Sequence, residues 1–135
     1  MLRQKSTWAL AAIILIGFAL RYLHLGDVPM RSPDEAGYTY FAVRIADSGI
    51  RSAPALFEEF LTKPDLQSYP APTRITYPLL EALVMRLSEV EDVDAGVAVS
   101  FVFSVLSLGL IAWLALRFFD PWTAVVSTAF LAFNL

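Results

Sequence analysis

The stretch Gly96–Leu116 reads GVAVSFVFSVLSLGLIAWLAL and contains no charged residue. As an α-helix it would span roughly 31 Å, because each residue rises about 1.5 Å, and the hydrocarbon core of a bilayer is about 30 Å thick. Ser100, Ser104 and Ser107 recur at spacings of four and three, so three small hydroxyls share a face that another helix can approach closely. The stretch therefore predicts a transmembrane helix.

The composition of the whole chain agrees with a membrane protein. Of the 135 residues, 57% are hydrophobic and 17% are charged, against about 45–50% and about 25% in a typical soluble domain. The net charge of −3 excludes the basic surface that a nucleic-acid binder needs. The chain has no cysteine and one histidine, which excludes disulfides, cysteine nucleophiles and histidine metal clusters.

A first apolar block occupies residues 6–25 and would span about 30 Å as a helix. Arg3 and Lys5 precede it, as in a secretory signal, but no small-residue cleavage site follows it, so we interpret it as an uncleaved anchor. Arg21 and His24 lie near its exit end, where we expect their side chains to reach the lipid headgroups.

A third apolar block, Pro121–Leu135, reaches only about 22 Å, which is short of the bilayer core. It predicts a third span that is truncated, and an amino-terminal piece of a larger multispan protein. A short helix in a locally thinned bilayer is the alternative.

The orientation follows from the basic residues beside the spans. Arg3, Lys5 and Arg117 flank one side, which predicts that this side is cytoplasmic. The loop 26–95 holds six basic and twelve acidic residues, and it exceeds the roughly 60-residue limit of the positive-inside rule. We therefore expect the loop on the outer face, most simply of the plasma membrane.

The outer loop opens with a strong helix start. Ser32 can cap, Pro33 suits the first helical position, and Glu35 completes a capping box. Gly49 supplies a stop, so we expect a surface helix over about 33–48. Its apolar stripe suits the membrane surface or the packing of other helices; it consists of Tyr38, Phe41, Ala42 and Ile45.

The rest of the loop predicts less regular structure. Four prolines in residues 50–77 favour an ordered but irregular segment. Pro78 begins a second predicted surface helix, about 78–90, with a stripe of Leu80, Leu83, Val84 and Leu87. The acidic residues between 89 and 94 are interpreted as a solvated connection. They form no EF-hand calcium loop.

Together these elements predict an all-α polytopic membrane protein. It would carry two to three transmembrane helices, in residues 1–25, 96–116 and 121–135, and an outer loop, 26–95, with two juxtamembrane amphipathic helices.

The pair Asp34-Glu35 has two interpretations. Both acids stabilise a helix start, through the helix dipole and the capping box. Alternatively, one carboxylate serves as a general base or electrostatic anchor at the membrane surface. The two interpretations are compatible, because the capping box occupies Glu35 and leaves Asp34 available.

The arrangement resembles the membrane glycosyltransferases of the GT-C fold, in the branch of the protein O-mannosyltransferases and aminoarabinose transferases. The similarity covers nearly the whole chain, but only the first three spans of a family with many more. It departs from the family pattern at Glu91–Asp94, where an arginine is frequent. Four motifs carry the resemblance: Arg21-Tyr22-Leu23 at the end of a first span, Pro33-Asp34-Glu35, Pro78-Leu79-Leu80, and Leu116-Arg117-Phe118-Phe119.

The resemblance implies transfer of a sugar from a polyprenyl-phosphate donor to an acceptor on the outer face, with inversion at the anomeric carbon. Asp34 would be the base, with Glu35 beside it. A lipid phosphate leaves as a stabilised anion, so the chemistry needs little beyond deprotonation of the acceptor hydroxyl.

The donor phosphate would need a fixed cation near the membrane. The candidates in the loop are Arg31, Arg44, Arg74 and Arg86, of which Arg74 is preferred because it lies beside Tyr77. Tyr38 and Tyr77 could stack on the sugar, although aromatic residues at a membrane interface often serve as anchors. No cofactor is identified, and the sequence offers no full ligand set for a divalent metal.

Two other classes of function remain open. The first is a small non-catalytic membrane subunit or scaffold whose outer helices bind a partner. The second is a transporter, which is weaker because we see no charge or Gly/Pro break at mid-depth in the spans.

Overall fold

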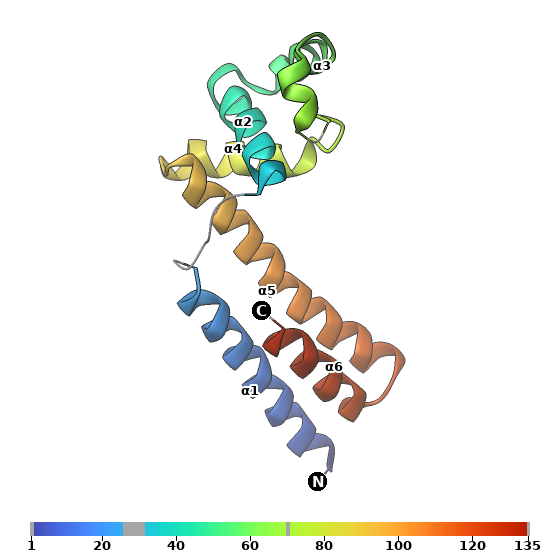
Figure 1. Ribbon diagram of the computed structural model, residues 1–135. Helices are drawn as coiled ribbons and strands as arrows, with labels where there is room; N and C mark the ends of the chain where they lie inside the picture. The colour runs from blue at the N-terminus through green and yellow to red at the C-terminus, as the bar shows by residue number, and fades with distance from the viewer. Residues whose placement is uncertain (1, 26–31, 70, 135) are drawn as a thin grey trace. The chain divides into compact units, whose positions relative to one another are not determined.

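The computed structural model describes residues 2–25, 32–69 and 71–134, and its regular structure in these residues is helical (Figure 1). The chain divides into two compact units, one formed by residues 1–27 and 101–135 and the other by residues 28–100. The predicted all-α class is confirmed for the described residues. The helices are α1 (Leu2–Leu23), α2 (Pro33–Ser48), α3 (Ala53–Thr62), α4 (Thr76–Ser88), α5 (Asp92–Phe118) and α6 (Pro121–Phe133), with 3₁₀ turns η1 (Ile50–Ser52) and η2 (Pro64–Ser68).

Two helices, α1 and α5, are long and apolar enough to cross a membrane. Helix α5 extends the predicted span 96–116 at both ends, and its first turn carries Asp92 and Asp94. Carboxylates are favourable there because they face the positive end of the helix dipole. Part of the predicted acidic connection is therefore helical. Helix α6 has 13 residues, about 20 Å, and is shorter than a full span.

The first unit packs its helices through small residues. Leu10 of α1 forms a buried cluster with Ala112 and Ala115 of α5 and Ala124 of α6. Between apolar helices in a bilayer there is no hydrophobic driving force. Such helices associate mainly through close van der Waals contact, which small side chains permit. Gly17 shows how close the approach is: a Cβ built on it would lie 2.9 Å from the Ala132 Cβ.

The predicted position of Arg21 at the lipid headgroups is wrong. Its guanidinium is half-buried and donates to the carbonyl oxygens of Leu131 (2.7 Å) and Ala132 (3.0 Å) in the last turn of α6. It also donates to the Gly17 carbonyl and to the Ser104 hydroxyl of α5. The carbonyls in the last turn of a helix lack hydrogen-bond donors within the helix. In an apolar environment this costs free energy, so a donor such as Arg21 stabilises the end of α6.

The second unit has a conventional apolar core. Phe41 and Ile45 of α2, Leu56 of α3 and Ala82 of α4 are buried together. The predicted stripe of α2 is thus confirmed as a packing face, directed at other helices.

The prediction of an irregular segment over 50–77 is wrong in part. Residues 53–62 form the helix α3, with Pro54 in its first turn and Leu56 on its buried side. Proline in the first turn removes no intrahelical hydrogen bond, so it is compatible with a helix start.

Candidate functional site

The start of helix α2 follows the predicted capping box. The Ser32 amide donates to Glu35 Oε2 (2.9 Å), and the Glu35 amide donates to Ser32 Oγ (3.3 Å). Pro33 takes the first helical position. The carboxylate of Glu35 is therefore held by the cap, whereas Asp34 stands beside it in the first turn and is exposed.

A pair of tyrosines lies between α2 and the start of α4. The ring centroids of Tyr38 and Tyr77 are 5.5 Å apart, with a tilt of 59° between the planes. The Tyr77 hydroxyl donates to the Gly96 carbonyl of α5 (3.1 Å) and shares a hydrogen bond with the Ser100 hydroxyl (2.9 Å). Both tyrosines are half-buried, so part of each residue stays accessible.

Arg74 contacts this tyrosine pair through Tyr38. Its Nη1 donates to the Tyr38 hydroxyl (3.3 Å). The pKa of Arg74 is raised, first by this hydrogen bond, then by the charge interaction with Tyr38 and more weakly by the negative charge of Asp34. The structure thus brings five of the residues singled out from the sequence into one cluster, the α2–α4 site. It consists of Asp34, Glu35, Tyr38, Arg74 and Tyr77.

Glu81 is a third acidic residue of this region, and its burial was not predicted from the sequence. Its side chain is only 2% exposed, and a Cβ built on Gly96 would lie 2.5 Å from Glu81 Oε1 and 3.8 Å from the Tyr77 hydroxyl. Its spacing of four residues from Tyr77 was visible in the sequence, because such residues share a helix face. The apolar stripe predicted for this helix does not include Glu81, so it gave no indication that Glu81 is buried.

The environment of Tyr77 raises the pKa of its phenol. Burial is the largest cause, and the negative charges of Glu81 and Glu35 act in the same direction. Each of these disfavours the phenolate. Tyr77 is therefore a neutral hydrogen-bonding group of the α2–α4 site at physiological pH.

The other candidate cations have different partners. Arg44 pairs with Glu59 of α3 (3.3 Å), which also binds Lys63 and the Tyr40 hydroxyl. The hydrogen bond from Lys63 is the largest cause of the lowered pKa of Glu59. Arg86 donates from Nε to the Ala46 carbonyl near the end of α2 (2.7 Å). Arg31 lies outside the described residues.

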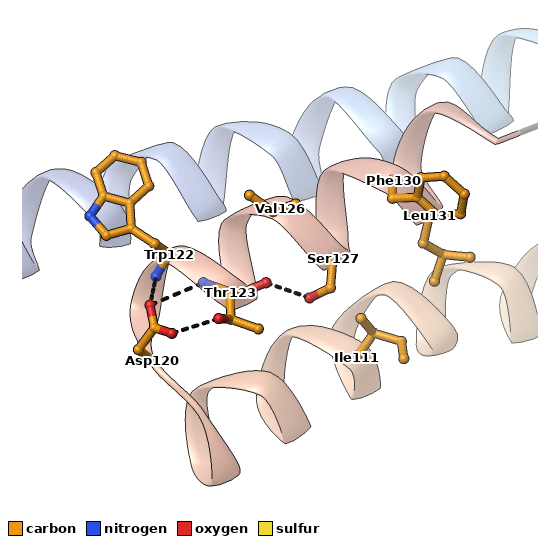
Figure 2. A pocket seen from close by; sticks show the side chains of 8 residues that line it. All are labelled: Ile111, Asp120, Trp122, Thr123, Val126, Ser127, Phe130 and Leu131. Atoms are coloured by element: carbon orange, nitrogen blue, oxygen red, sulfur yellow. Dashed lines mark hydrogen bonds between the residues drawn. The ribbon is translucent and has the colours of Figure 1, made fainter.

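A groove of about 780 Å³ lies in the first unit, between α5 and α6 (Figure 2). At one end Asp120 accepts hydrogen bonds from the amides of Trp122 and Thr123 and from the Thr123 hydroxyl. These bonds lower the pKa of Asp120, the Thr123 hydroxyl contributing most. The carboxylate serves as the N-cap of α6, and the rest of the groove is mainly apolar.

Within residues 2–25, 32–69 and 71–134, no three His, Cys, Asp or Glu side chains are grouped so that they could hold a metal ion. Comparison with protein-family models, curated proteins and solved structures found no match to this chain. The described residues form an all-helical fold with two candidate membrane-spanning helices.

Proposed function

We propose that the chain is the amino-terminal part of an integral-membrane glycosyltransferase. The reaction would move a sugar from a polyprenyl-phosphate donor to an acceptor on the outer face, with inversion. The observation that supports this proposal is the α2–α4 site, in which an exposed carboxylate, a guanidinium and two phenol rings are gathered from α2, the segment before α4 and the start of α4. The resemblance of the sequence motifs to GT-C glycosyltransferases supplies the reaction class.

In this proposal Asp34 is the general base. Glu35 is engaged by the capping box, so its neighbour is the carboxylate with freedom to meet an acceptor hydroxyl. Asp34 takes the hydroxyl proton as the oxygen attacks the anomeric carbon, and the bond to the donor phosphate breaks. The lipid phosphate departs as an anion, so a second carboxylate acting as an acid is unnecessary, in contrast to glycosidases.

Arg74 and the tyrosine pair would bind the donor. A guanidinium carries five N–H donors, so the bond from Arg74 to Tyr38 leaves capacity for two phosphate oxygens. The tilted rings of Tyr38 and Tyr77 offer apolar faces for the C–H groups of a sugar. The remaining donor contacts would come from other membrane spans.

The test is the Asp34→Asn variant of the full-length protein that contains this chain, purified in detergent and supplied with polyprenyl-phosphate-linked hexoses and pentoses. Loss of a general base should reduce sugar transfer by about 10²–10⁴-fold without loss of protein. Asp47→Asn is the matched control, because Asp47 is also exposed and lies at the other end of α2. Retention of transfer by Asp34→Asn would refute the assignment.

The alternative is a small non-catalytic membrane subunit. It is favoured by one observation: the capping box explains an acidic helix start without any catalysis. An antibody against residues 26–95 distinguishes the two, because it reports the mass of the endogenous polypeptide. A band several times heavier than 15.0 kDa supports the glycosyltransferase, and a band at 15.0 kDa supports the subunit.

A further inference from the structure

Helix α4 buries one acidic residue, Glu81, and exposes two leucines, Leu83 and Leu87. Pro78, Glu81 and Ala82 are buried in the second unit, and Ala82 packs in the core with Phe41 of α2. Leu83 and Leu87, one turn apart, are 51% and 76% exposed. A helix packed on a core in water normally does the reverse. We call the surface formed by Leu83 and Leu87 the α4 outer face.

The beginning of α5 is fixed against the beginning of α4. The Tyr77 hydroxyl binds the Gly96 carbonyl (3.1 Å) and the Ser100 hydroxyl (2.9 Å), and Ala95 is fully buried. Ala95 and Gly96 are also the first two residues of the charge-free stretch of α5, which follows Asp94. If α5 spans a bilayer, α4 is therefore held at the depth where α5 passes from the polar interface into hydrocarbon.

The charges of α4 suit the same location. Its acidic residue, Glu81, is buried, and its basic residue, Arg86, is exposed. The Nε of Arg86 donates to the Ala46 carbonyl (2.7 Å), which leaves its other guanidinium N–H groups for headgroups. An exposed basic residue next to an apolar face is typical of helices that lie in the membrane interface, because the cation meets anionic headgroups.

We propose that the α4 outer face docks on the lipid bilayer itself, with Leu83 and Leu87 inserted among the acyl chains and Arg86 at the headgroups. The bilayer is favoured over a protein partner because the α4 outer face is tied through Tyr77 to the first residues of a candidate span. The inference is independent of whether the α2–α4 site is catalytic.

The absence of cysteine allows a direct test with single spin labels. The variants Leu83→Cys and Leu87→Cys are labelled in the full chain, in vesicles of phosphatidylcholine and phosphatidylglycerol. Leu61→Cys is the matched control, because Leu61 of α3 is 71% exposed but far in sequence from α5. Collision rates are measured with oxygen, which concentrates in the acyl region, and with a water-soluble nickel complex.

We expect the ratio of oxygen to nickel collisions to be severalfold higher at residues 83 and 87 than at residue 61. Equal ratios at the three positions would overturn the proposal, since the α4 outer face would then lie in water. Low collision rates with both reagents at 83 and 87 would also overturn it, because they would indicate that protein covers this face. Circular dichroism checks that each labelled variant keeps its helix content.

Discussion

At Gly17 the missing side chain decides how two helices meet. A Cβ there would lie 2.9 Å from the Ala132 Cβ and 3.0 Å from the Leu108 Cδ1. The alanine neighbour has no side-chain torsion that could relieve the contact, so helix α1 or α6 would have to move. Gly109 of α5 differs, because a Cβ built on it meets nothing within 4 Å.

We therefore expect Gly17→Ala to destabilise the first unit by about 1–3 kcal/mol, the usual cost of overpacking. Gly109→Ala should be neutral or stabilising by up to about 1 kcal/mol, since alanine is the better helix former. Thermal unfolding in detergent, followed by circular dichroism, measures both. Equal midpoints for the two variants would show that α1 and α6 are not in the close contact described.

Tyr77 gives a prediction about pH. Burial and neighbouring carboxylates raise its folded-state pKa above the ordinary 10.0. A raised pKa means that this group stabilises the fold below its unfolded pKa, and that the contribution is lost as the pH rises through the folded pKa. The difference in tyrosinate absorbance between the wild type and Tyr77→Phe should therefore appear above pH 10.0. Ionisation of Tyr77 at or below that pH would contradict the described burial.

At the scale of elements, Arg21 connects three helices. Its guanidinium, on α1, reaches the last turn of α6 and the Ser104 hydroxyl of α5. A helix end in an apolar environment is costly when its carbonyls lack donors. The side chain therefore acts as a C-cap supplied by a different helix.

We expect Arg21→Met to destabilise the first unit by about 1–3 kcal/mol, because two part-buried carbonyl oxygens lose their donor. Arg21→Lys should recover only part of the loss, since an ammonium lacks the planar fork that reaches several oxygens. Arg117→Met, at the exposed end of α5, is the control. Unfolding midpoints in detergent that are the same for all three variants would show that Arg21 has no capping role.

At the scale of the whole molecule, the two candidate spans imply a topology. If α1 and α5 each cross the bilayer, residues 32–69 and the connection at Phe119–Asp120 lie on opposite sides. The basic residues that flank the spans predict that the first of these segments is outside.

Single cysteines test this topology, because the chain has none of its own. In intact cells a membrane-impermeant maleimide should label Glu58→Cys in α3 and leave Phe119→Cys unlabelled until the cells are opened. Both positions are exposed in their own units. Labelling of both variants in intact cells would reject two membrane crossings, and the reverse pattern would invert the orientation.

Local sequence determined much of this protein. The capping box at Ser32–Glu35 and the charge-free stretch of α5 are interactions of residues within a few turns, so their patterns predict structure directly. The residues of the α2–α4 site were also identifiable, since an acidic helix start and a flanking arginine are local features. The hydrogen bond between Arg74 and Tyr38 could not be predicted, because 36 positions separate the two residues in the sequence.

Other features were decided only by the tertiary structure. Periodicity finds the apolar stripe of α4, but it cannot say whether that stripe or Glu81 faces the core, because burial depends on which helix lies opposite. In the same way, the position of Arg21 near the end of an apolar block predicts that it faces the headgroups. Only the packing of α6 shows that its guanidinium binds carbonyl oxygens. Long-range packing, and the need of buried polar groups for partners, decided both outcomes.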